Sequence, residues 1–282
     1  MSEMIASGEF LTERPGTREK AELGAGVANT SVQLAGRTPE AMADAAKLVE
    51  AMGAQVIDIN MGCPAKKVVG GYSGSALLRD LDHACRLIDA VVSAVSVPVT
   101  LKTRLGWDDA CLNAAELAQR AEQLGIAMLV IHGRTRCQFY KGRANWRAIR
   151  DVKQAVSIPI IANGDIVDTQ TARTALAESG ADGVMIGRGA QGRPWLLAQV
   201  ASDIFGTPAP QIPSGLALVD MVQGHYDALL SFYGNELGNR VARKHLGWYM
   251  DDAETDPSVR RAILTSKDPA YVMNALPDAL LT

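Results

Sequence analysis

The chain has 282 residues and a mass of 30.0 kDa, with 48% hydrophobic and 21% charged residues and a formal net charge of -3. This composition indicates a globular protein with one large core, or with one large domain and one small domain. The net charge excludes an even coat of positive charge, although a local basic patch can still attract nucleic acid.

No apolar run reaches membrane-spanning length, and the first twenty residues lack the pattern of a signal peptide. The four cysteines, Cys63, Cys85, Cys111 and Cys137, form no C-x-x-C pair. We therefore expect a cytoplasmic protein with no membrane partner, no disulfide framework and no metal site.

Strands and helices alternate along the first two thirds of the chain. The strands are expected at 31–35, 56–60, 97–102, 128–132, 158–162 and 183–186, with a strand remnant at 1–7. Helices are expected near 39–52, 80–95, 112–124, 145–155, 168–179 and 194–204, the first with Thr38 as N-cap and Pro39 at its first position. Apolar strands separated by amphipathic helices predict an α/β fold, a (β/α)8 TIM barrel with about six full units and an incomplete N-terminal end.

The composition changes after residue 206. A proline-rich linker is predicted at 207–213, because prolines cannot continue a helix. Beyond it, apolar residues at helical spacing predict a helix that ends at Gly234, and a second helix is expected near 236–250. Two shorter helices follow, the last of which begins at Asp268. The predicted domains are thus a catalytic barrel at 1–206 and a small all-α domain at 214–282 with a basic face.

The stretch from Val56 to Lys67 carries the chain's most suggestive chemistry. Asn60 lies at the carboxyl end of a strand, Cys63 follows in a tight turn, and Lys66 and Lys67 come next. Ligands of parallel α/β folds bind beyond the carboxyl ends of the strands. A lone cysteine is more often a packed structural residue, but this position and the two lysines favour a chemical role.

Three further polar residues are predicted to face the same mouth of the barrel as Cys63. Gln33, Lys102 and His132 each lie at or near the end of a strand. A single such lysine can be a cation whose stem is merely buried, whereas the whole group favours ligand contacts. We find no catalytic triad, paired catalytic carboxylates or metal-ligand cluster. A bound cofactor is therefore expected to carry the chemistry.

Two glycine-containing loops predict a phosphate site. Asn163-Gly164-Asp165 follows one strand and Gly187-Arg188-Gly189 follows the next. Backbone N–H groups at these positions of a barrel commonly hold a phosphate, and Arg188 adds a charge.

The segment from His132 to Arg150 is basic. It contains six cations and no acid, with Phe139, Tyr140 and Trp146 between them. The cations are Arg134, Arg136, Lys141, Arg143, Arg147 and Arg150. The segment is either a solvated surface or a nucleic-acid contact.

With these motifs in view, the chain resembles the tRNA-dihydrouridine synthases of the bacterial B-type branch over nearly its whole length. The matching stretches are SVQLAG (31–36), DINMGCPAKKV (58–68), LKTRLGW (101–107), IHGRTRCQFYKGRANW (131–146), ANGDI (162–166), MIGRG (185–189) and RVARKHLGWY (240–249). The combination of NMGCPAKKV with HGRTR is specific, whereas NGD and GRG occur in many phosphate-binding barrels.

The resemblance implies an FMN-dependent oxidoreductase that uses NADPH to reduce the C5–C6 double bond of uridine in tRNA. It implies that Cys63 is the proton donor. It implies flavin contacts from Gln33, Lys102, His132, Asn163, Gly164, Asp165, Gly187 and Arg188. Contacts with tRNA are expected from Asn60, Lys66, Lys67, Arg134, Arg136, Arg243 and Lys244.

The start of the chain departs from the family pattern. Members begin with a strand and a Pro-Met-Ala-like segment against the flavin, and we find no such segment here. We therefore expect an open seam in the barrel, weakened flavin binding and low solubility. Two alternatives stay open, a different FMN barrel acting on a small molecule and an inactive tRNA-binding remnant. We expect a monomer, and the sequence does not identify the modified uridine.

Overall fold

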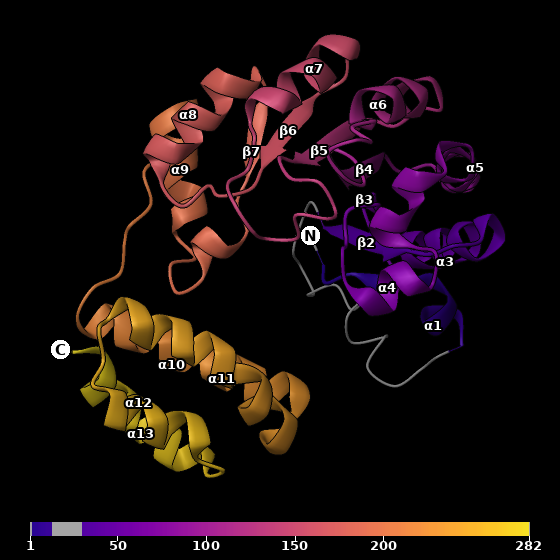
Figure 1. Cartoon of the computed structure of the whole chain (residues 1–282). Coiled ribbons are helices and arrows are strands. Elements are labelled where there is room, and N and C mark those ends of the chain that lie inside the picture. Colours follow the sequence, from indigo (N-terminus) through magenta and orange to yellow (C-terminus); the bar gives the residue numbers. More distant parts are fainter. Residues whose placement is uncertain (1, 13–29, 282) are drawn as a thin grey trace. The chain divides into compact units, whose positions relative to one another are not determined.

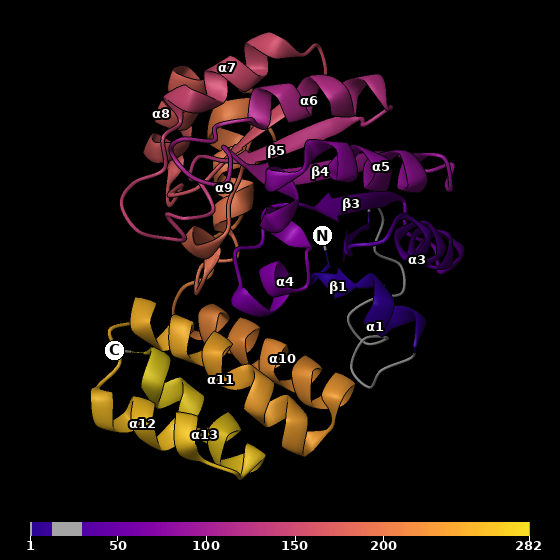
Figure 2. The ribbon, with the colours of Figure 1, turned by 45° about the vertical axis from the view of Figure 1, so that its right-hand side comes forward.

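The computed structural model describes residues 2–12 and 30–281. The chain divides into two compact units (Figures 1 and 2). The first unit covers residues 1–166 and 171–185, and the second covers 167–170 and 186–282. The predicted division at 206 and 214 stays a prediction.

The first unit is built on one sheet of seven parallel strands in chain order. They are β1 (Ile5–Ala6), β2 (Ser31–Ala35), β3 (Val56–Asn60), β4 (Val99–Arg104), β5 (Met128–His132), β6 (Ile160–Asn163) and β7 (Gly183–Met185). The helices that alternate with them are α3 (Pro39–Ala51), α5 (Leu81–Val92), α6 (Ala114–Gln123), α7 (Arg147–Ala155) and α8 (Thr169–Ser179). This arrangement confirms the predicted barrel class, with the strand remnant as β1.

The core lies between the sheet and these helices. Ile57 and Ile59 of β3 are buried, as are Leu87, Ile88 and Val91 of α5. The helix buries one apolar stripe while its other face carries charge, which is the pattern that docks a helix on a sheet. Each such aliphatic side chain contributes about 1.5–3 kcal/mol by leaving water.

Two strands begin later than the sequence pattern predicts. β4 starts at Val99 and β6 at Ile160, each two residues after the expected position. The residue before each start is a proline, Pro98 or Pro159. Proline has no N–H to donate into a sheet, so the ladder opens after it. Both proline carbonyls still accept hydrogen bonds from the preceding strand in the sheet.

A glutamate fastens each of these proline turns. Glu50 Oε1 accepts from Ser96 N at 2.8 Å, Ser96 Oγ at 2.7 Å and Val97 N at 3.1 Å. Glu122 Oε1 makes the same three contacts with Ser157 and Ile158. The serine hydroxyl and backbone bonds lower the pKa of each glutamate. We call these two arrangements the glutamate clamps.

Thr38 lies at the N-cap position of α3, as predicted, but its side chain does not cap the helix. Pro39 opens α3, but the Thr38 side chain makes no capping hydrogen bond. By contrast, Asp80 caps α5 by accepting from His83 N at 2.9 Å. The sequence therefore located the helix start correctly, and the capping bond predicted for Thr38 is wrong.

The second unit is helical beyond residue 190. Its elements are the 3-10 turn η2 (Arg188–Ala190), α9 (Leu196–Phe205), α10 (Leu216–Tyr233), α11 (Asn235–Asp252), α12 (Pro257–Thr265) and α13 (Pro269–Leu280) (Figure 1). Residues 207–213, the predicted linker, have no regular secondary structure. Val222, Tyr226, Leu246, Ile263 and Leu276 share the core of the last four helices.

Candidate active site

The loop that carries Cys63 is held from both sides. Asn60 Oδ1 accepts from Gly62 N at 3.1 Å and from Cys63 N at 2.9 Å. The Cys63 carbonyl accepts from Ser75 N at 3.1 Å and from Ser75 Oγ at 2.8 Å. Ser75 belongs to the 3-10 turn η1 (Gly74–Arg79), which follows the short helix α4 (Lys66–Gly70). The thiol is thus half-buried on a fixed backbone at the carboxyl end of β3.

The predicted polar residues of neighbouring strands meet beside this loop. Asn60 pairs with Lys102 in the sheet register, and His132 pairs with Asn163. Lys102 Nζ donates to Asn163 Oδ1 at 3.1 Å. Gln33 lies one step deeper, in the middle of β2 rather than at its end, and β4 continues two residues beyond Lys102. The structure therefore groups these side chains. The prediction that Gln33 and Lys102 end their strands is wrong, because each strand continues two residues further.

The charges of the group are shaped by burial. Burial lowers the pKa of Lys102 to about 8, and Arg104 adds to this effect while Asp58 and Cys63 oppose it. Burial also lowers the pKa of His132 to about 3, reinforced by Arg104 and Lys102. At neutral pH the imidazole is therefore uncharged and can donate one hydrogen bond and accept another.

Asp58 is a buried acid that sequence reasoning missed. It lies within β3, is fully buried, and accepts from Gln33 Nε2 and Thr100 Oγ1, both at 2.7 Å. Burial raises the pKa of its carboxyl group. The available signal was an acid inside the apolar run VIDIN, where a carboxylate needs partners from adjacent strands.

Arg134 is placed differently from the tRNA contact predicted for it. Its side chain is only 2% exposed and forms a two-pronged pair with Asp165 at 2.6 and 2.9 Å. Its remaining N–H groups reach the carbonyls of Lys141 and Gly142. Because the guanidinium is enclosed and committed to these partners, it does not present its charge at the surface. Its role here is to hold Asp165 and its own loop.

Gly164 lies against His132. Its φ is +113°, and a Cβ atom there would meet the His132 ring at 2.7 Å and Ala144 Cβ at 2.9 Å. The Gly164 carbonyl accepts from Trp146 Nε1 at 2.9 Å. The predicted phosphate loop 163–165 is thus held tightly against the imidazole, and only glycine fits its centre.

A half-buried arginine of the basic segment is stacked on aromatic rings. Arg136 packs over the rings of Trp107 and Phe139, both at 4.7 Å, and Arg79 covers Trp107 at 4.9 Å. Such contacts hold guanidinium planes in a fixed orientation. Tyr140 is 55% exposed beside them. Lys66 is also exposed on α4.

Lys67 is exposed next to Lys66. The Lys67 side chain is 83% exposed and lies 3.6 Å from Glu9 of the helix α1 (Ser7–Leu11). An ion pair this exposed contributes little and can be exchanged for another partner.

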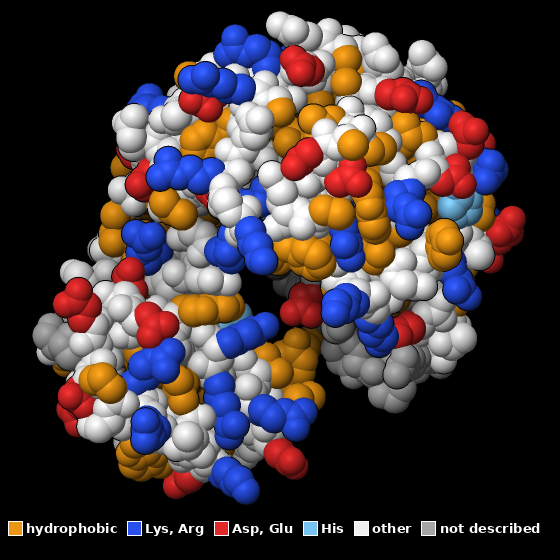
Figure 3. Space-filling view, in the orientation of Figure 1, with side chains coloured by type: hydrophobic (Ala, Val, Ile, Leu, Met, Phe, Trp, Pro, Cys, Tyr) orange, Lys and Arg blue, Asp and Glu red, His pale blue; other side chains and the backbone are white. Residues whose placement is uncertain are grey.

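The remaining predicted residues belong to the second unit. Gly187 and Arg188 lie at the start of η2, and a Cβ atom at Gly187 would meet nothing within 4 Å. Arg243 and Lys244 lie on α11, where Arg243 is half-buried and reaches Ser266 O at 3.4 Å, and Lys244 is exposed. Lys and Arg side chains gather on the face of the helical bundle visible in Figure 3.

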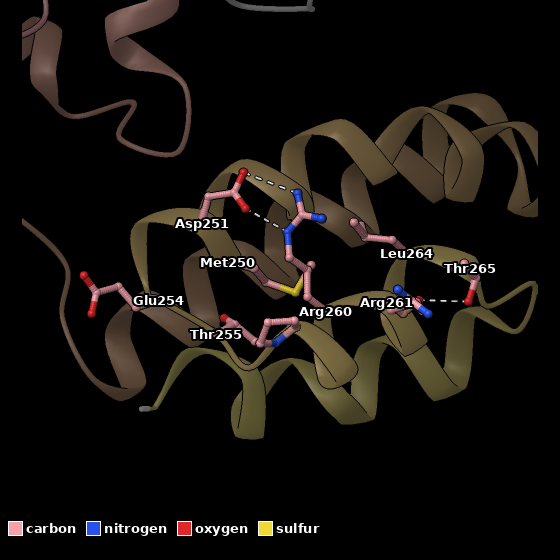
Figure 4. Close-up of a pocket in the computed structure, with 9 residues that line it drawn as sticks. Met250, Asp251, Glu254, Thr255, Arg260, Arg261, Leu264 and Thr265 are labelled. Carbon is pink, nitrogen blue, oxygen red and sulfur yellow. Dashed lines mark hydrogen bonds and ion pairs between the residues drawn. The ribbon is translucent and has the colours of Figure 1, made fainter.

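The helical bundle also contains a pocket of about 680 Å³ (Figure 4). Arg260 crosses its wall and pairs with Asp251 at 2.7 and 3.3 Å, while Thr265 Oγ1 donates to the Arg261 carbonyl at 2.8 Å. Arg260, Asp251 and Thr265 at this wall thus already have partners within the bundle. Across residues 2–12 and 30–281, no helix is long and apolar enough to cross a membrane, and no cluster of three metal-ligating side chains occurs.

Comparison with known proteins identifies the family. The sequence model described as "Dihydrouridine synthase (Dus)" matches residues 1–282. The chain belongs to the dihydrouridine synthase family. The resemblance predicted from the motifs is confirmed.

Curated dihydrouridine synthase relatives match most of the chain. One from Rhodobacter capsulatus, named "Probable tRNA-dihydrouridine synthase", is 60% identical over 97% of this chain and 84% of its own length. One of the same name from Rickettsia conorii is 48% identical over 96% of this chain and 82% of its own. "tRNA-dihydrouridine synthase B" of Xanthomonas campestris is 50% identical over 85% of this chain and 72% of its own. As a dihydrouridine synthase homologue, the chain is an oxidoreductase.

Proposed function

We propose that this chain reduces the C5–C6 double bond of uridine in tRNA, with FMN as its cofactor and NADPH as the reductant. The names of its relatives support the reaction class. The observation that carries the proposal is Cys63, held half-buried at the carboxyl end of β3 near the ammonium group of Lys102.

The donor set fits a flavin. Lys102 and His132 supply N–H groups near the carboxyl ends of their strands, and a flavin ring offers carbonyl oxygens that accept them. Gln33 and Asn163 each already donate one N–H within the protein, to Asp58 and to the Met185 carbonyl. Lys102 can also balance negative charge on a reduced ring. Asp165 is neutralised by Arg134, so its carboxylate does not oppose a phosphate nearby. When bound, FMN supplies the hydride, which it receives from NADPH.

We assign the phosphate and ribityl contacts to residues predicted from the glycine loops. In the first unit these are Asn163, Gly164 and Asp165, whose loop is rigid against His132. Gly187 and Arg188 belong to the second unit, and their phosphate role stays a prediction from the motif. These roles rest on the family motif and on backbone N–H groups being available to an anion.

Cys63 supplies the proton that completes the reduction. Hydride addition at C6 leaves a negative charge that a proton at C5 must neutralise. A general acid must carry the proton that it delivers, and the S–H group of a thiol can do so. Asn60 orients the loop through its oxygen and gives one N–H to Gln33, which leaves one further N–H for the uracil edge.

The tRNA contacts follow from exposure and charge. Lys66 and Lys67 flank the Cys63 loop, and the stacked Arg136 lies on the basic segment. In the second unit, Arg243 and Lys244 supply charge on α11. The target base must leave its stack to reach the half-buried cysteine, and cations along the backbone hold the tRNA while it does so.

The test is turnover by the purified full chain. Its visible absorption with added FMN reports flavin binding, and tRNA-dependent NADPH oxidation reports the reaction. We expect Cys63→Ala to lower kcat by 10²–10⁴-fold, the usual contribution of a general acid, with tRNA affinity unchanged. Cys137→Ala is the matched control, because that cysteine is exposed on the basic segment.

Three outcomes would contradict the proposal in different ways. Full activity in Cys63→Ala removes the thiol from the mechanism. NADPH oxidation that tRNA does not stimulate favours an FMN enzyme acting on a small molecule. Binding of tRNA without any flavin spectrum favours an inactive tRNA-binding remnant, and it also agrees with the weak flavin binding expected from the sequence.

A further inference from the structure

Asp58 begins a chain of hydrogen bonds that ends at the Cys63 backbone. Its carboxylate accepts from Gln33 Nε2 at 2.7 Å. Gln33 Oε1 in turn accepts from Asn60 Nδ2 at 2.8 Å, and Asn60 Oδ1 accepts from Gly62 N and Cys63 N. We call this series the amide relay. Its side chains are less than 9% exposed, so water does not compete for these bonds.

The direction of the amide relay is fixed at the Asp58 end. A carboxylate only accepts hydrogen bonds, so Gln33 must turn its NH2 group toward Asp58. The Gln33 oxygen then faces Asn60, which must donate a hydrogen bond from its own NH2 group. The Asn60 oxygen is left to face the two loop N–H groups. Reversal of Asn60 would set its NH2 group against the two loop N–H groups and remove the cap of the loop, and a reversed Gln33 would set its NH2 group against that of Asn60 and so favour that reversal.

We propose that Asp58 is a positioning residue that fixes the Cys63 loop through the orientation of Gln33 and Asn60. The proposal rests on the proposed function, in which Cys63 is the proton donor. Asp58 reaches Cys63 only through two intervening side chains. Thr100 Oγ1 binds the other carboxylate oxygen at 2.7 Å, and the Lys102 ammonium favours the charged form.

Three variants distinguish the orientation of the amide relay from a general loss of hydrogen bonds to Asp58. Asp58→Asn keeps the shape but offers an NH2 group that can reverse the amide relay. Gln33→Met leaves the Asp58–Thr100 bond in place and interrupts the amide relay after its first member. Thr100→Val is the matched control, since it removes a bond of similar length to the same carboxylate without touching the amide relay.

The readout is the alkylation rate of Cys63 by iodoacetamide, followed by peptide mass spectrometry on protein without flavin or tRNA. We expect Asp58→Asn and Gln33→Met to alkylate Cys63 about fivefold to tenfold faster, because the loop loses a buried cap. The pH profile of this rate shifts in the same two variants. Thr100→Val and the wild type share one rate and one profile, and Cys137 reacts equally in all four proteins.

A second measurement tests the consequence for turnover. Asp58→Asn is expected to lower kcat while leaving KM for tRNA unchanged, since Asp58 is fully buried. An unchanged Cys63 alkylation rate in Asp58→Asn overturns the proposal. If that variant does not fold, an unchanged rate in Gln33→Met overturns it equally. Failure of the proposed function appears separately, as activity in Cys63→Ala, and leaves the alkylation result standing.

Discussion

At the scale of single residues, Gly164 shows how closely the site is packed. A methyl group at this position must displace the His132 ring, and alanine is strained at φ +113°. We expect Gly164→Ala to lower the free energy of unfolding by about 2–5 kcal/mol, from backbone strain and overpacking together. Urea unfolding measures this change.

Gly180→Ala is the control for backbone strain alone. Gly180 also has positive φ, +67°, but a Cβ atom there meets nothing within 4 Å. We expect it to cost about 1–2 kcal/mol. Equal costs for the two variants would show that the His132 ring yields to the methyl group.

The neutral His132 predicts a loss of stability in acid. Its pKa is about 3 in the folded chain against about 6.5 when unfolded, so between these values the unfolded state binds the extra proton. The free energy of unfolding therefore falls as pH falls from 6.5 toward 3, by up to about 1.4 kcal/mol per pH unit from this residue.

Urea unfolding at several pH values tests the contribution of His132. His132→Gln should flatten the dependence on pH because glutamine does not titrate. Parallel curves for this variant and the wild type would contradict a neutral His132.

The residues of the site were only partly predictable from the sequence. The grouping of Lys102 and His132 with Cys63 was predicted from strand ends, because parallel strands bring their carboxyl ends to one edge, although β4 continues beyond Lys102. The burial of Arg134 did not follow. A cation that follows a strand can face solvent or pair with an acid from another loop. The sequence does not reveal that the partner of Arg134 is Asp165. Asp58 escaped notice for the same reason.

At the scale of elements, most strands and helices followed from apolar periodicity and from turn residues. β2, β3 and β5 have the predicted bounds. β4 and β6 were predicted two residues early, since hydropathy does not register a missing N–H. The glutamate clamps were also missed, because each joins a helix to a turn 35 to 47 residues away.

The glutamate clamps give a prediction at this scale. Glu50→Ala and Glu122→Ala should each speed amide hydrogen exchange in its own proline turn, at Ser96–Val97 or Ser157–Ile158, because those N–H groups lose their acceptor. Each variant leaves the other turn unchanged and so serves as its control.

Acid should weaken the same contacts. The folded pKa of each glutamate lies below its ordinary value, so the stabilisation is present above about 4.5 and is lost as pH falls through the folded pKa. If neither substitution changes the rate of amide hydrogen exchange in the two turns, the glutamate clamps are contradicted.

At the scale of the whole molecule, residues 207–213 are mostly exposed and have no regular structure. Such segments are preferred by proteases. We expect a broad-specificity protease at low concentration to cut first between 206 and 214. The fragments, read by mass spectrometry, should then persist, since the apolar core of the sheet lies before the cut and that of the last four helices lies after it. A first cut within 136–145 would contradict this expectation.

One guanidinium gives the first unit a mechanical property. Arg104 donates through Nε to Gly62 O at 2.7 Å, and through Nη1 to Thr135 O at 3.0 Å and Phe139 O at 2.9 Å. Arg104 thus connects the turn that carries the thiol to the basic segment. A displacement of that segment would therefore also move the backbone next to Cys63. In the proposed function, a tRNA bound to the basic segment therefore also acts on the backbone that positions the proposed proton donor.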